Sequence, residues 1–182
     1  LSGLVAARLG AERVVLTDYT EAILANAQRN AAANRLGDSV VVRRLDWRAP
    51  WPPSSSDASH AGTFDWRPSD LRELDRVELI LAADCVYDDA LTEALVGTLA
   101  QLLATASPRA VALVAIEKRV NFCADTLDVR APALEHFLAC VRRDERLELA
   151  RVPCDFPQAF AYERVKDLEV FRVSTRQHDT PG

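Results

Sequence analysis

The strongest constraint on the fold is a pair of nearly unbroken apolar runs, residues 77–84 and 109–118. Strands that are apolar at successive positions are buried on both faces, which is typical of parallel sheets covered by helices. Between the two runs, residues 89–105 carry leucines at helical spacing. This alternation predicts an α/β fold with a doubly wound, mostly parallel sheet.

The first part of the chain shows the same alternation of helical and extended patterns. Helices and strands are expected in turn at residues 3–11, 13–18, 20–38 and 39–47. Thr20 is suited to cap the start of the second helix, and Gly37 is suited to end it.

The last part of the chain predicts a different kind of pairing. A helix is expected at 131–144, followed by two segments in which apolar and polar residues alternate, 146–152 and 168–174. Alternation of this kind is typical of strands with one solvated face. Because these two strands follow each other, we expect an antiparallel hairpin at one edge of the sheet.

The chain has 182 residues, which is enough for one domain with a sizeable core. We expect a single domain over residues 1–176, a mobile insertion rich in Pro and Ser at 48–70, and a disordered tail at 177–182. The competing interpretation of the insertion is a linker between two domains. A short helix within 64–76 is predicted, with Ser69 as its cap.

Composition excludes several classes of protein. The net charge of −5 argues against a broad nucleic-acid-binding surface. No apolar stretch approaches the roughly 18 residues that a membrane span needs. The cysteines form no CxxC pair, and we interpret the histidines as distant from them, so no metal site is expected. The cysteines are Cys85, Cys123, Cys140 and Cys154.

Polar residues follow three of the predicted strands, at the edge where a doubly wound sheet binds its ligands. Asp18 follows the first and is suited to bind ribose hydroxyls, although it could equally cap the next helix. Asp46 and Trp47 follow the second. An indole ring can stack on a purine, whereas the alternative is a tryptophan that shields the end of the sheet. Asp84 ends the apolar run at 77–84 and Tyr87 follows it, where the reactive end of a ligand would lie; the alternative is a solvated loop acid and a half-buried tyrosine.

The acid after RVVLT, the LDW at 45–47, the AADCVYD at 82–88 and the EKRVNF at 117–122 together resemble the class I, seven-strand methyltransferases. The Asp-x-x-Tyr pattern, with FDW in the loop before it, is similar to that of the methyltransferase-like protein-lysine methyltransferases. The resemblance implies a Rossmann-like methyltransferase domain. It also implies S-adenosyl-L-methionine as cofactor, a lysine in a protein substrate as methyl acceptor, and a monomeric intracellular enzyme of the nucleus or cytoplasm.

The resemblance also implies roles for particular residues. The cofactor-binding residues would be Gly3, Asp18, Asp46, Trp47 and Ala83. The catalytic pair would be Asp84 and Tyr87, with Asp84 facing the cofactor and Tyr87 positioning the lysine. Glu117 and Asn121 would lie near the mouth of the substrate site.

One feature departs from the family pattern. The sequence has no methionine and opens on Leu1-Ser2-Gly3, which is similar to the end of the family's glycine-rich loop. We therefore expect a chain that lacks the first strand and most of that loop. Loss of a central strand leaves its neighbours' backbone groups unpaired, so we expect such a chain to be unstable and to bind cofactor poorly.

Three other functions are compatible with parts of the pattern. The chain could methylate nucleic acid or a small molecule, although it has no basic stripe. It could be a non-catalytic interaction domain that has lost cofactor binding. A nicotinamide-dependent dehydrogenase would share the acid at residue 18, but it would explain neither LDW nor DCVY.

Overall fold

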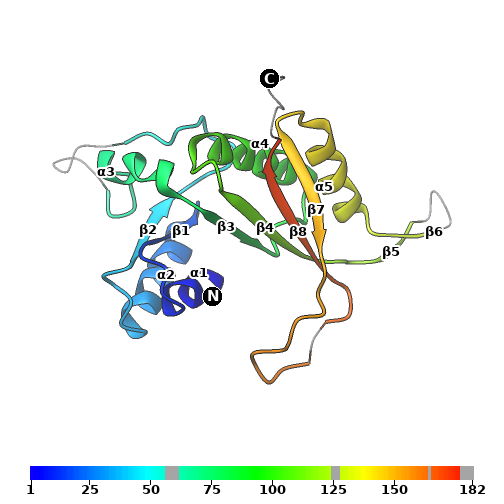
Figure 1. Cartoon of the computed structure of the whole chain (residues 1–182), viewed down its shortest axis with the longest axis horizontal. Helices are drawn as coiled ribbons and strands as arrows, with labels where there is room; N and C mark the ends of the chain where they lie inside the picture. Colours follow the sequence, from blue (N-terminus) through cyan, green and yellow to red (C-terminus); the bar gives the residue numbers. More distant parts are fainter. Residues whose placement is uncertain (56–61, 124–127, 164, 177–182) are drawn as a thin grey trace, which may run out of the picture. The chain divides into compact units, whose positions relative to one another are not determined.

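The computed structural model describes residues 1–55, 62–123, 128–163 and 165–176. The chain divides into two compact units, residues 1–74 and 75–182. Figure 1 shows the helices and strands of both. The single domain expected over 1–176 therefore stays a prediction. The expected tail at 177–182 and the middle of the 48–70 insertion lie outside the described residues.

Unit 1 contains a parallel pair of strands joined by a helix. Its order is α1 (Ser2–Arg8), β1 (Val14–Asp18), α2 (Glu21–Ala33), β2 (Val40–Arg44) and α3 (Pro68–Arg72), with a 3-10 turn at Leu74–Arg76 that crosses into the second unit. Strands β1 and β2 are parallel, with Val14 opposite Val40 and Asp18 opposite Arg44. The carboxyl ends of both strands therefore lie at the same edge.

The core of unit 1 forms where the helices meet this pair of strands. Leu24 of α2 is fully buried and packs with Val42 of β2 and with Phe64. A second cluster joins Ala7 of α1, Ala31 of α2 and Val40 of β2. Burying such side chains contributes roughly 1.5–3 kcal/mol for each large one.

A buried ion pair holds the last residues of the 48–70 insertion onto β2. Nε of Arg43 donates to Oδ2 of Asp70 at 2.5 Å, and the Asp70 side chain is only 1% exposed. Arg13 and the backbone N–H of Arg67 donate to the same carboxylate. Burial alone would raise the pKa of Asp70, but the hydrogen bonds and charges of these partners outweigh it and lower the pKa.

Unit 2 is built on a four-stranded sheet in the order β3-β4-β8-β7. Strands β3 (Leu79–Ala83) and β4 (Val111–Glu117) are parallel, whereas β7 (Leu147–Val152) and β8 (Leu168–Thr175) form an antiparallel hairpin. Because β8 pairs with β4, the hairpin extends the sheet and β7 lies at its edge. The mixed α/β class, with parallel strands and an antiparallel edge hairpin, is confirmed.

Two helices pack on each other and on this sheet. Helix α4 (Asp89–Thr105) contacts β4 and β8, and α5 (Pro132–Arg143) contacts β7 (Figure 1). The ring of Phe137 on α5 lies 5.9 Å from that of Phe171 on β8, at a tilt of 52° that favours aromatic pairing. None of the described helices combines the length and apolar character that crossing a membrane requires.

Two local expectations were wrong, and one small element was not expected. Gly37 does not end α2: the helix ends at Ala33, Asn34 is its C-cap, and Arg35 then adopts the left-handed conformation (φ 57°). Ser69 does not cap the short helix, since Arg67 is the N-cap and Asp70 accepts its backbone N–H. A small hairpin of β5 (Asn121–Cys123) and β6 (Asp128–Arg130) was not predicted.

The buried ion pair gives a first prediction. Asp70→Asn leaves the Arg43 guanidinium buried without a counter-charge, so we expect the free energy of unfolding to fall by about 3 kcal/mol at neutral pH. Denaturant unfolding of the variant and of the exposed control Asp75→Asn measures this difference. An equal loss in both variants would contradict the role of the pair.

The difference should also depend on pH. Because the folded pKa of Asp70 is lowered, its stabilising contribution is fully present above the ordinary Asp value of about 3.9. The contribution is lost as the pH falls through the folded value. The gap between the native protein and Asp70→Asn should therefore narrow in acid.

Candidate active site

Strand pairing in unit 1 brings the first two groups of predicted site residues to one edge. The backbone N–H of Leu45, just after β2, donates to the carbonyl of Asp18 at the end of β1, at 2.9 Å. Asp46 and Trp47 follow directly, and both side chains are half-buried. The structure thus places Asp18, Asp46 and Trp47 at the carboxyl ends of neighbouring parallel strands.

Asp18 serves the local turn and keeps acceptor capacity. Its Oδ1 accepts the backbone N–H of Thr20 at 2.7 Å, which orders the start of α2. The Thr20 side chain makes no capping hydrogen bond, so the acid and not the hydroxyl supports this turn. Among the described residues no donor reaches Oδ2, and that oxygen can accept hydrogen bonds from a ligand.

Asp46 is engaged by a residue that sequence reasoning did not single out. The Arg48 guanidinium donates from Nε and Nη2 to the two oxygens of Asp46, both at 2.9 Å. Hydrogen bonds from the Arg48 side chain and backbone lower the pKa of Asp46. Arg48 also lies over the exposed ring of Tyr19, 5.6 Å from its centre. The Asp46 carboxylate is therefore ionised, and Arg48 holds its orientation.

Gly3 has a packing reason of its own. A Cβ at this position would lie 2.3 Å from Cδ2 of Leu16 and 3.2 Å from Cγ1 of Val14. The missing side chain lets α1 approach β1 closely. Its expected contact with the cofactor stays a prediction.

In unit 2 the second half of the predicted site follows β3. The backbone N–H of Asp84 donates to the carbonyl of Ala115 on β4 at 2.9 Å, which extends the parallel ladder past Ala83. Asp84 then turns the chain sharply, with φ at +55°. This left-handed conformation is disfavoured for most residues but is tolerated by Asp, Asn and Gly.

The carboxylate of Asp84 is paired with Arg119, which follows β4. Nη2 of Arg119 lies 3.0 Å from each carboxylate oxygen. Both side chains are about half-exposed, at 59% for Asp84 and 49% for Arg119. An ion pair this exposed contributes little to stability and is easily exchanged. Arg119 lies within the EKRVNF stretch, where sequence reasoning had named only Glu117 and Asn121.

Tyr87 is 56% exposed and lies between the turn and helix α4. Asp88 is the N-cap of that helix, because its carboxylate accepts the N–H of Leu91 at 2.8 Å. Asp89 is the acidic residue of the first turn, so both carboxylates serve the start of the helix. Ala83 is the last residue of β3, Glu117 ends β4, and Asn121 begins β5.

The structure therefore assembles the predicted residues in two groups. Asp18, Asp46 and Trp47 share one edge in unit 1. In unit 2, one edge of the sheet carries Ala83, Asp84 and Arg119, and Tyr87 lies three residues after Asp84. The union of these groups into one pocket stays a prediction.

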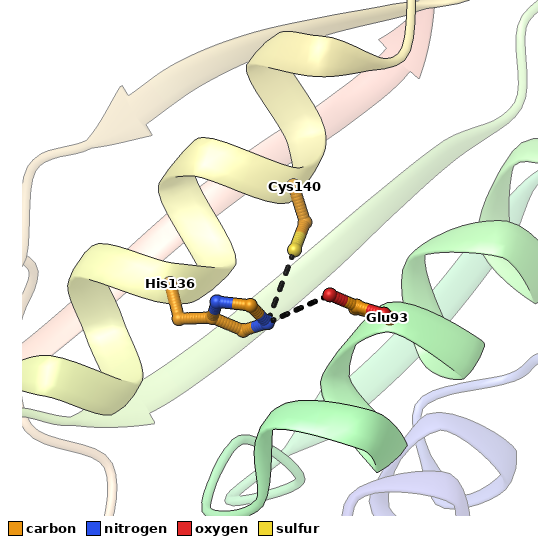
Figure 2. Close-up of side chains that lie close together, drawn as sticks. All are labelled: Glu93, His136 and Cys140. Carbon is orange, nitrogen blue, oxygen red and sulfur yellow. Dashed lines mark hydrogen bonds and ion pairs between the residues drawn. The ribbon is translucent and has the colours of Figure 1, made fainter.

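A third group of reactive side chains was missed entirely. His136 lies four residues before Cys140 on α5, and Nε2 of His136 is 3.4 Å from Sγ of Cys140. Glu93 of α4 is the third member (Figure 2). The interpretation of the histidines as distant from the cysteines was wrong here. The His-x-x-x-Cys spacing within a predicted helix could have revealed the pair, because positions four apart share a helix face.

Comparison with known proteins supports the resemblance seen in the motifs. Residues 54–130 match the model of a family described as lysine methyltransferase. Over 186 residues the chain is 34% identical to methyltransferase-like protein 22 of Mus musculus. It is 31% identical, also over 186 residues, to methyltransferase-like protein 22 of Homo sapiens. The expected similarity to the methyltransferase-like protein-lysine methyltransferases is confirmed.

The matches cover different shares of this chain and of the relatives. The alignments cover 95% of this chain but only 46% and 45% of the two relatives, so the chain spans about half their length. A solved structure from Clostridium thermocellum, provisionally described as an rRNA-methylase, matches with a TM-score of 0.54 and 12% identity. It covers 94% of this chain and 78% of that protein, and it supports the fold alone.

The backbone of Asp84 gives a second prediction. Asp84→Asn keeps a residue that tolerates φ near +55°, whereas Asp84→Ala places an ordinary side chain in a conformation that costs about 1 kcal/mol or more. We expect the alanine variant to be less stable than the asparagine variant by roughly that amount. Denaturant unfolding of the two proteins, with Asp84→Gly as a further control, measures it. Equal stability of all three would show that the turn imposes no backbone demand.

Proposed function

We propose that this chain forms part of a protein-lysine methyltransferase, which transfers a methyl group from S-adenosylmethionine to a lysine side chain of a protein substrate. The observation that carries the proposal is the match of residues 54–130 to a lysine methyltransferase family, because this range contains both Asp84 and Tyr87. The similarity to methyltransferase-like protein 22 supports the same activity.

The residues of unit 1 fit the nucleoside part of this cofactor. Asp18 keeps one carboxylate oxygen that can accept hydrogen bonds from ribose hydroxyls, while its other oxygen holds the turn. Trp47 offers a half-buried aromatic face on which a purine can stack. Arg48 holds the orientation of the neighbouring Asp46, whose carboxylate can accept a hydrogen bond from an amino group.

The residues of unit 2 fit the amino-acid part. Asp84 and Arg119 present one negative and one positive group side by side. A zwitterionic amino acid carries the complementary pair of charges. Because the Asp84–Arg119 pair is exposed and weak, a ligand can replace it without a large loss of stability. We expect Arg119 to release the Asp84 carboxylate when the ligand binds. Asp84 would then hold the ammonium group of the ligand.

When bound, S-adenosylmethionine supplies a methyl group on a sulfonium, which is already activated for displacement by an amine. The protein's contribution is then mainly alignment and exclusion of water. A lysine amine must be uncharged to react, although its ordinary pKa is about 10.4. Desolvation beside Tyr87 lowers that pKa, whereas a carboxylate beside the amine would raise it. We therefore assign Tyr87 to position the lysine nitrogen through its hydroxyl, and Asp84 to the cofactor.

A third prediction concerns cofactor affinity. Asp18→Asn keeps the side-chain size and the acceptor for Thr20 but removes the carboxylate charge. Loss of hydrogen bonds to a charged group costs about 1.5–3 kcal/mol, so we expect affinity for S-adenosylmethionine to fall at least about tenfold. Isothermal titration of the protein measures it, with the exposed Asp38→Asn as control. Unchanged affinity would remove the ribose role of Asp18.

A fourth prediction concerns the transfer step. Tyr87→Phe removes only the hydroxyl, so we expect methyl transfer to fall about tenfold or more while cofactor affinity is retained. Labelled cofactor is incubated with the protein and, separately, with protein or RNA fractions as acceptors. Tyr162→Phe, another exposed tyrosine of unit 2, is the matched control. Full activity of Tyr87→Phe would refute its assignment, and label found only in RNA would refute the protein substrate.

A further inference from the structure

Three potential metal ligands meet where α4 and α5 pack against each other. Glu93 projects from α4, while His136 and Cys140 project from α5 toward it (Figure 2). Because His136 and Cys140 are four residues apart, they lie one above the other on the same face of their helix. The contact between the helices therefore fixes all three groups on rigid elements of a single unit.

Two of the distances between the donor atoms match those of a tetrahedral zinc site. Zn–N and Zn–O bonds of about 2.0–2.1 Å and a Zn–S bond of about 2.3 Å place tetrahedral ligand atoms roughly 3.3–3.6 Å apart. Here Nε2 of His136 is 3.4 Å from Sγ of Cys140 and 3.5 Å from Oε1 of Glu93. All three donor atoms lie within 4.8 Å of one another. Only small side-chain movements are needed to close around an ion.

The surroundings combine burial with negative charge. Cys140 is buried, the His136 side chain is 24% exposed and the Glu93 side chain is 59% exposed, so the cluster runs from the core to solvent. Asp89 lies one turn before Glu93 on α4 and adds a second carboxylate charge that acts on Cys140. The exposed end of the cluster, at Glu93, gives an ion a path of entry. At the buried end Cys140 supplies sulfur, the softest of the three ligand atoms.

Two features oppose metal binding and must be outweighed. Burial raises the pKa of the Cys140 thiol, so an incoming ion has to displace a proton. The Arg143 guanidinium lies 3.9 Å from the Cys140 sulfur and contributes positive charge. A thiolate ligand, one imidazole and one carboxylate together carry two negative charges, which neutralise a divalent ion and offset both costs.

We propose that Glu93, His136 and Cys140 form a binding site for a single Zn²⁺ ion, with the fourth position open to water. The set of one sulfur, one nitrogen and one oxygen donor suits zinc, whereas magnesium and calcium prefer oxygen ligands alone. The ion would join α4 to α5 and so stabilise unit 2. The site shares no residue with the proposed methyl-transfer site.

The test is a zinc titration of the native protein against a chromophoric chelator, in a reducing buffer without thiols. We expect one Zn²⁺ per chain, and an affinity that falls at least about tenfold in His136→Gln, Cys140→Ser and Glu93→Gln. Cobalt substitution should give the intense visible absorption of a tetrahedral ion together with a thiolate charge-transfer band. Both signals should be absent from Cys140→Ser.

Matched controls separate this site from general metal binding. Cys154→Ser removes another thiol of unit 2, and Glu145→Gln removes an exposed carboxylate beyond α5. Both variants should bind zinc like the native protein. Because Glu93 is exposed, Glu93→Gln should fold normally even if Cys140→Ser does not.

Zinc should also raise the melting temperature of the native protein and of both controls, but not of the three site variants. Absence of stoichiometric binding would overturn the proposal. Native affinity in Glu93→Gln or Cys140→Ser would overturn the three-residue site equally.

Discussion

Parallel pairing of adjacent strands is the constraint on which the candidate sites depend. In a parallel pair both carboxyl ends lie at one edge, and any residue that follows one strand meets a residue that follows its neighbour. The register of β3 with β4 brings Asp84 against Ala115 and thereby within reach of Arg119. The register of β1 with β2 likewise brings the N–H of Leu45 to the carbonyl of Asp18. Each polar group at these edges owes its position to backbone hydrogen bonds between apolar strands.

Much of the fold could be predicted because the hydrophobic pattern is strong. The apolar runs became β3 and β4, and the alternating segments became the β7–β8 hairpin. Boundaries depended on local detail that the pattern does not carry. Arg35 supplies the left-handed residue that closes α2, where glycine was expected. The start of α3 depends on Asp70, whose carboxylate is held by arginines 27 and 57 residues away in the sequence.

The sequence predicted where the candidate site residues lie, but not which side chains they contact. Polar residues at strand ends can be read directly from the sequence, and the structure places Asp18, Asp46 and Asp84 there. The arginine partners of Asp46 and Asp84 could not be assigned, because a charged residue in a loop has many possible contacts. Arg119 is 35 residues from Asp84, and only the strand register determines that they meet. The Glu93–His136–Cys140 cluster was missed because it needs the packing of two helices, although its His136–Cys140 half was visible as a spacing of four.

The attachment of residues 64–70 to β2 has a consequence for sequence divergence. Arg44 and Phe64 share a backbone hydrogen bond of 2.7 Å, Nε1 of Trp66 donates to the carbonyl of Arg44, and Asp70 binds Arg43. These contacts hold the chain against β2 immediately after the Pro/Ser-rich stretch. Because these contacts involve none of residues 56–61, we expect a change in the number of those residues to leave β2 and its edge unchanged.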